Sequence, residues 1–157
     1  MSTAQPTFLL SSAGHQDFYE LGFRVLRAHP DVTVLRLRGH KSRTKQAFMD
    51  ETGAVLQVPW YFGENWDALN DVLSAGGWLP GHLLLVPNAD ELLVDADADD
   101  FRVFAELMDN CNRAYLDETV EEQSDDGGFH VVLQVPEPAM RGFAARLEPT
   151  GATFDSL

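Results

Sequence analysis

Two acidic side chains, Asp67 and Asp71, lie four residues apart in the stretch YFGENWDALNDVL, which runs from Tyr61 to Leu73. Residues four apart in a helix share one face, so two carboxylates would stand side by side there. Paired carboxylates can act as general acid and base, can ligate a divalent metal, or can bind cationic groups of another protein. No Lys or Arg within the stretch offsets their charge.

The segment 65–74 is predicted to be a helix with two distinct faces. Asn65 can cap its start, and Gly63 in the preceding turn is available for a backbone conformation that other residues resist. The apolar positions expected to face the core follow helical spacing: Trp66, Leu69 and Leu73. A second face carries the polar positions: Asp67, Asp71 and Ser74, with Asn70 beside them.

Strands alternate with helices along the rest of the chain. The pattern predicts strands at 32–37, 82–86 and 129–135, and helices at 44–57, 99–116 and 141–147. An extended run, PTFLLSS, and a further helical pattern precede the first of these strands. The acidic run at 95–100 is interpreted as a contributor to the dipole and cap of the long helix. Alternation of this kind implies βαβ units and a parallel sheet.

The composition of the chain limits the kinds of molecule that it is expected to bind. The chain has 157 residues, which favours one domain, and 45% of its residues are apolar, which is typical of globular proteins. Its formal net charge is −14, and residues 46–101 contain eleven Asp or Glu residues and no Lys or Arg. Direct binding to DNA or RNA is not expected, because it needs cations against the phosphates. The same charge would attract a basic protein.

Motifs for catalysis, metals and cofactors are missing from the sequence. The five histidines form no HxxxH or HxH pattern, and no nucleophile motif, GxGxxG or Walker loop occurs. We therefore expect no catalytic residue, no metal and no small-molecule cofactor. No apolar run is long enough for a membrane span, and no secretory signal is recognisable. A single cysteine suits a reducing compartment, so the cytoplasm is the expected location.

The stretch 61–73 resembles the signature of the barstar family, the intracellular inhibitors of barnase-type ribonucleases. The shared pattern is an aromatic pair, Gly, a polar residue, Asn, an apolar residue, Asp-Ala-Leu and a further Asp. The order of the predicted elements agrees over residues 32–135. The resemblance implies a small three-stranded parallel sheet flanked by helices, within one domain. Residues 1–31 and 136–157 would be extensions that add elements to the sheet or cover an edge.

By this resemblance, the protein is expected to inhibit a basic ribonuclease or a related toxin as its immunity partner. Carboxylates on a helix would stand in for the phosphates of RNA in a basic active site. Asp71 would be the central anchor, with Asp67 its acidic neighbour. The other implied contact positions are Tyr61, Gly63, Asn65, Asn70, Ser74 and Trp78, and Glu106 is added from the long helix without a motif behind it.

Two differences from the family pattern affect which partner the chain would bind. Asn70 stands where the founding inhibitor has a large aromatic residue, and Trp78 is a candidate replacement for an aromatic contact. Two other functions stay open on the sequence. One is a small acid-dependent or metal-dependent hydrolase that uses Asp67 and Asp71. The other is an interaction module that keeps the fold without inhibiting anything.

Overall fold

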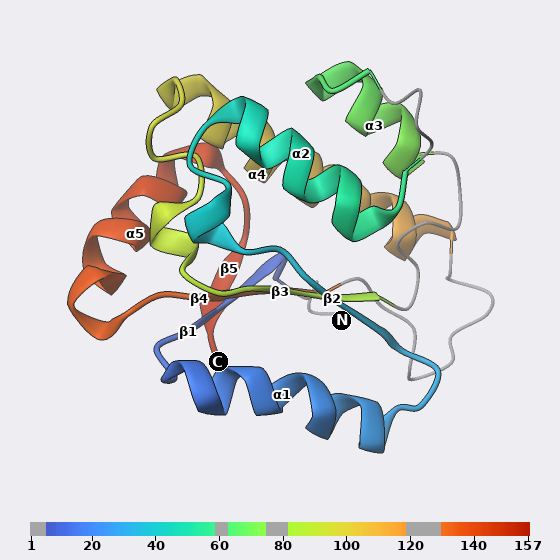
Figure 1. Cartoon of the computed structure of the whole chain (residues 1–157), viewed down its shortest axis with the longest axis vertical. Coiled ribbons are helices and arrows are strands. Elements are labelled where there is room, and N and C mark those ends of the chain that lie inside the picture. The colour runs from blue at the N-terminus through green and yellow to red at the C-terminus, as the bar shows by residue number, and fades with distance from the viewer. Residues whose placement is uncertain (1–5, 59–62, 75–81, 119–129) are drawn as a thin grey trace.

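A five-stranded parallel sheet runs through the part of the chain that the structure describes. The computed structural model describes residues 6–58, 63–74, 82–118 and 130–157. The strands are β1 (Phe8–Ser11), β2 (Thr33–Arg36), β3 (His82–Val86), β4 (His130–Gln134) and β5 (Phe154–Ser156). Their order is β2-β3-β4-β1-β5, and each adjacent pair is parallel (Figure 1).

The prediction of a three-stranded sheet is wrong, because each extension adds a strand. The predicted strands 32–37, 82–86 and 129–135 correspond to β2, β3 and β4. β1 lies between β4 and β5, and its Leu10 is buried opposite Leu133 of β4. β5 has one apolar residue, the half-buried Phe154, so no local pattern marks it as a strand.

Helices cover both faces of the sheet. α1 (His15–Ala28) lies alone on one face among the described helices, and the others lie on the opposite side (Figure 1). Those are α2 (Lys45–Leu56), α3 (Trp66–Ser74), α4 (Ala98–Glu118) and α5 (Met140–Leu147). Short 3₁₀ turns occur at Gly39–Lys41, Ala89–Glu91, Glu137–Ala139 and Glu148–Thr150. This layering is what right-handed crossovers between parallel strands produce.

The predicted helix 44–57 corresponds to α2. Its start is fixed by the Thr44 hydroxyl, which accepts a hydrogen bond from the Ala47 amide at 3.1 Å. The helix continues through Gly53 and ends at Leu56, where Gln57 adopts a left-handed conformation with φ of 52°. The predicted range therefore agrees with the observed helix, which Thr44 caps.

Aromatic rings join the sheet to the helices that will carry the candidate site. Phe104 of α4 is fully buried, and its ring centroid lies 6.0 Å from Phe8 of β1 and 5.6 Å from Phe48 of α2. A second, smaller cluster fills the space under α1: Phe18, Leu83, Leu85 and Val132. The two clusters bury both faces of the central strands, as a parallel sheet requires.

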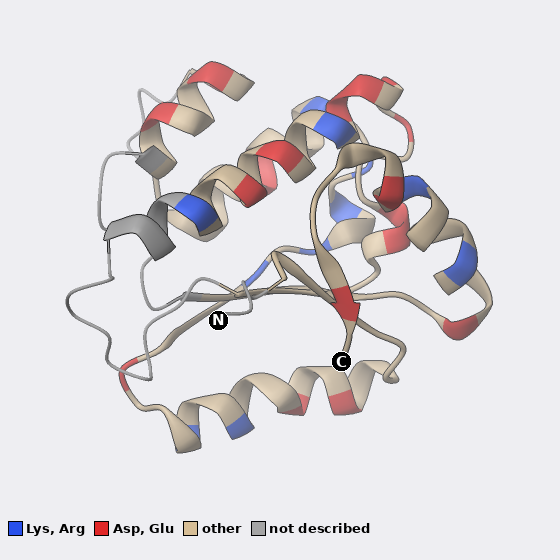
Figure 2. Ribbon diagram, turned by 180° about the vertical axis from the view of Figure 1, so that it is seen from behind, with Lys and Arg blue, Asp and Glu red and all other residues tan. Residues whose placement is uncertain are grey.

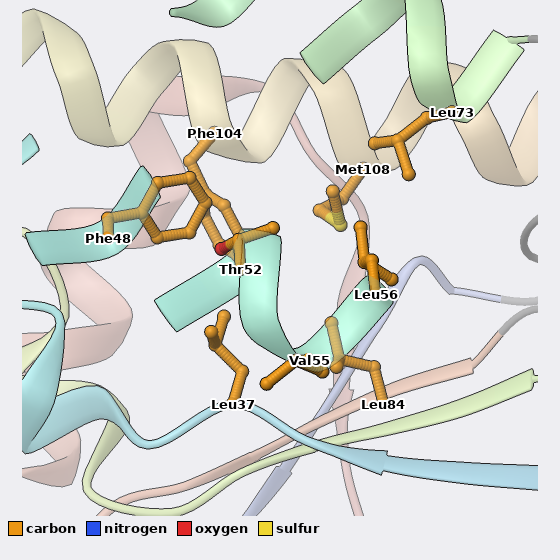
Figure 3. Close-up of a pocket in the computed structure, with 9 residues that line it drawn as sticks. All are labelled: Leu37, Phe48, Thr52, Val55, Leu56, Leu73, Leu84, Phe104 and Met108. Carbon is orange, nitrogen blue, oxygen red and sulfur yellow. The ribbon is translucent and has the colours of Figure 1, made fainter. Parts of the chain in front are cut away.

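A small apolar hollow remains between α2, α3, α4 and the sheet. Its volume is about 20 Å³, enough for about one water molecule. Figure 3 shows the side chains that line it: Leu37, Phe48, Thr52, Val55, Leu56, Leu73, Leu84, Phe104 and Met108. The Thr52 hydroxyl oxygen is buried here with no hydrogen-bond partner in the described structure. A water would find one polar partner in this lining, too few to hold it.

Replacing Thr52 with Val is expected to stabilise the protein by about 1–2 kcal/mol, because it removes a buried, unpaired hydroxyl while keeping the side-chain shape. Urea unfolding of the variant measures the change. Thr52→Ala is the matched control: it removes the same hydroxyl and also a methyl group, so it should be less stable than Thr52→Val. A loss of stability in Thr52→Val would show that the hydroxyl is paired in solution.

Candidate functional site

α3 begins as its sequence predicts. The Asn65 side-chain oxygen accepts a hydrogen bond from the Ala68 amide at 2.8 Å, and its side-chain nitrogen donates to the Gly63 carbonyl at 3.1 Å. Glu64, with φ of 52°, is a left-handed residue in the turn before the helix. Gly63 lies close to the helix, where an added Cβ would come within 3.2 Å of the Ala68 Cβ.

The inner face of α3 is attached to both neighbouring helices. Leu69 is fully buried and Leu73 nearly so. The Trp66 ring packs on Phe48 of α2, with ring centroids 5.2 Å apart. Its indole nitrogen donates a hydrogen bond to a carboxylate oxygen of Asp100 in α4 at 2.9 Å. α3 therefore has a defined orientation relative to the rest of the fold.

The outer face of α3 carries the two carboxylates. Asp67, Asn70 and Asp71 are all exposed. Neither aspartate forms a salt bridge with any residue that the structure describes. Figure 2 shows acidic positions on α3 in red and no basic position on that helix. Two uncompensated charges on an anchored helix make a negatively charged surface that faces solvent.

The remaining predicted contact positions are placed differently. Tyr61 and Trp78 lie outside the described residues, and Ser74 is the last residue of α3, with its side chain likewise outside them. Glu106 is exposed on α4 and forms a salt bridge with Arg102 at 2.7 Å.

Glu106 instead borders the C-terminal segment. It lines a hollow of about 280 Å³ together with Asp109, Asn110, Arg113, Thr150, Gly151 and Ala152. It lies six positions after Asp100, which places it about 120° around α4 from the residue that holds Trp66. Its assignment as a partner contact rested on no motif, and its role stays a prediction.

Asp100 is the structural residue of this site that sequence reasoning missed. The acidic run at 95–100 predicted a helix cap, and the structure does place Asp100 in the first turn of α4. Its additional role as acceptor for Trp66, 34 positions earlier, is a contact between two helices. A buried indole N–H needs an acceptor, which is the one signal that could have suggested the pair.

Replacing Asp100 with Ala is expected to lower the free energy of unfolding by about 1–2 kcal/mol, because the half-buried Trp66 indole loses its acceptor. Asp100→Asn, which keeps an acceptor oxygen, is the control and should retain most of the stability. The indole N–H proton resonance of Trp66 reports the bond directly. An unchanged resonance in Asp100→Ala would contradict the contact.

Two further possibilities for the described residues are a metal site and a membrane span. Among the described residues, no group of three or more His, Cys, Asp or Glu side chains could hold a metal ion. Asp67 and Asp71 are exposed, and they belong to no such group within the part of the chain that the structure describes. No described helix is both long enough and apolar enough to cross a membrane.

Comparison with known proteins identifies the region that contains α3. Residues 32–134 match the family described as "Barstar (barnase inhibitor)". A comparison with curated protein sequences gives no match. Among solved structures, the fold is similar to a chain in the "Structure of Drosophila ORC bound to GC-rich DNA and Cdc6", with a TM-score of 0.53 and 17% sequence identity. The similarity covers 96% of this chain and 48% of that chain. Because the sequence identity is so low, it shows a shared fold alone.

Proposed function

The chain belongs to the barstar family, and from this premise we propose that it inhibits a basic ribonuclease or a related toxin. α3 and the turn before it would fill the active site of the toxin. The observation that carries this proposal is the pair Asp67 and Asp71, exposed on an anchored helix without counter-charges among the described residues. Such charges make sense when their partners belong to another molecule.

Charge and rigidity both support this function. An enzyme that binds RNA phosphates presents Arg, Lys or His side chains, and carboxylates can pair with the same groups. The net charge of −14 would also accelerate encounter with a basic protein at low salt. The contacts of Trp66 with Phe48 and Asp100 hold the helix in place before binding, which lowers the entropic cost of association.

An inhibition assay tests the function directly. The purified protein is titrated into a barnase-type ribonuclease at micromolar concentration, and RNA cleavage is followed. Affinity capture from the native host runs beside it and identifies the bound proteins by mass spectrometry. We expect a stoichiometric loss of ribonuclease activity, or capture of a basic toxin that the protein then inhibits. Capture of a partner whose activity stays unchanged would instead favour an interaction module, and failure of both assays would remove the proposal.

The salt dependence of the association and dissociation rates distinguishes a specific acidic interface from non-specific attraction by net charge. Association should slow steeply as ionic strength rises, because screening shortens the range of the negative field to about 8 Å at physiological salt. Dissociation should change much less, because it depends on the contacts that are already buried. Stopped-flow measurement of both rates over a series of salt concentrations gives the answer.

A further inference from the structure

We propose that a second site, on the α1 side of the sheet, binds a small molecule that carries a phosphate group. The site is a hollow of about 550 Å³, a volume common for small-molecule pockets. It lies where β2 and β3 end and α1 begins. Its lining residues are His15, Gln16, Phe18, Tyr19, Arg36, Arg38, His40, Leu85, Pro87 and Asn88. In parallel α/β sheets, the carboxyl ends of the strands are the usual place for a ligand.

The central observation is the guanidinium of Arg36. Its Nε and Nη2 atoms are buried and find no hydrogen-bond acceptor among the described residues. The group contacts ring faces instead, at 5.0 Å from the Tyr19 centroid and 5.6 Å from that of Phe23. Nε and Nη2 form one edge of the guanidinium, the edge that grips two oxygens of a phosphate or carboxylate at once. Because both atoms are buried, an oxyanion would supply the missing acceptors by displacing the side chains that cover them.

The helix above Arg36 leaves space for this arrangement. Gly22 is buried in α1, and a Cβ at that position would lie 2.7 Å from the Arg36 Nη2 atom. Any larger residue would therefore push the guanidinium away from its present position. Gly22 and the two aromatic rings therefore hold an unpaired guanidinium in place at the side of the hollow.

The charge of the hollow is opposite to that of the whole chain. Its lining contains two arginines and two histidines and, among the described residues, no Asp or Glu. Arg38 is already paired with Glu51 at 2.7 Å, so Arg36 is the unpaired arginine of the lining. In a protein with a net charge of −14, a hollow with one unpaired arginine and no acidic residue in its described lining is suited to an anion.

Two histidines supply further polar groups. Asn88 joins them: its side-chain oxygen accepts from His15 Nε2 at 2.9 Å, and its side-chain nitrogen donates to His40 Nδ1 at 3.0 Å. Since Nδ1 of His40 accepts, its Nε2 carries the ring proton and can donate to a ligand. The backbone amide of Asn88 is held in turn by the Gln134 side chain at 2.8 Å.

These groups favour a phosphate over a carboxylate. A phosphate monoester has three terminal oxygens and up to two negative charges, so it can engage both the Arg36 edge and a histidine N–H. The exposed Tyr19 ring, which packs edge-on against Phe23 at 5.1 Å, provides an apolar wall for the organic part of the ligand. The proposed ligand class is therefore a phosphate ester with a compact apolar or aromatic group.

Calorimetric titration of the full-length protein tests the site with three probes: phenyl phosphate, inorganic phosphate and benzoate. We expect saturable binding of phenyl phosphate, weaker binding of inorganic phosphate and the weakest binding of benzoate. Arg36→Met should lower the affinity for phenyl phosphate by about tenfold to a hundredfold, the effect of losing charge-assisted hydrogen bonds. The control Arg141→Met, an exposed arginine of α5, should change it by less than about twofold.

Gly22→Ala is the second variant, and it keeps every charge. It should weaken phenyl phosphate binding by displacing the guanidinium, with the circular dichroism spectrum unchanged. Because the site does not involve α3, Asp71→Ala should bind phenyl phosphate like the wild type, whatever becomes of ribonuclease inhibition. The proposal is overturned if phenyl phosphate fails to saturate the protein, if benzoate binds more tightly, or if folded Arg36→Met and Gly22→Ala both bind like the wild type.

Discussion

Replacing Asp71 with Ala is expected to weaken binding of the ribonuclease or toxin partner by about 30-fold to several thousand-fold, equivalent to about 2–5 kcal/mol. The loss is large because a cation in the active site of the partner would be buried without its counter-charge. The stability of the free protein should change little, since the exposed Asp71 has no salt bridge among the described residues.

Glu20→Ala is the matched control for this variant. It removes the same charge from an exposed position on α1, on the opposite face of the sheet (Figure 1). We expect a small decrease in the association rate and almost no change in dissociation. Surface plasmon resonance measures both rates. Equal losses in Asp71→Ala and Glu20→Ala would mean that the overall charge attracts the partner and that α3 is not the binding element.

A fragment of residues 32–135 is expected to lack a cooperative unfolding transition, although it contains the whole family match. It lacks five large buried apolar side chains of the full fold: Phe8, Leu10, Phe18, Phe143 and Leu147. Each such burial contributes about 1.5–3 kcal/mol, whereas a whole domain is stable by about 5–15 kcal/mol. The fragment would also expose one edge of β4, where β1 pairs in the intact sheet.

Urea titration followed by circular dichroism tests this prediction. A chain that lacks residues 154–157 is the control, because it loses only β5, an edge strand in which Phe154 is half-buried. That chain should still unfold cooperatively, at a lower urea concentration than the full-length protein. A sigmoidal transition in the fragment 32–135 would show that the family region folds without the strand that the N-terminal extension adds.

The local parts of the site followed directly from the sequence. Asn65 caps α3 because its short polar side chain reaches an amide three residues later. Trp66, Leu69 and Leu73 face inward because their spacing matches the helical repeat. Asp67 and Asp71 are exposed for the same reason. Each of these features depends on residues within one or two helical turns, so a linear pattern contains the necessary information.

The sheet shows where local patterns stop being sufficient. β1 and β5 are short, and their pairing joins the two ends of the chain: Phe8 lies opposite Phe154. No spacing rule predicts which strands become neighbours when the contacts are this far apart in sequence. The Glu64 conformation is a smaller example, since the glycine next to it was the more obvious candidate for a left-handed φ.

By itself, the sequence determined the family, the parallel α/β class and the acidic face of α3, because each is encoded in side-chain types at short, regular intervals. The packing of distant segments decided that the sheet has five strands, that Asp100 holds Trp66 and that Glu106 borders the C-terminal segment. It also brought Arg36 beneath Gly22 without an acceptor. Those outcomes depend on which distant segments pack together, and packing is settled by the burial of the whole chain.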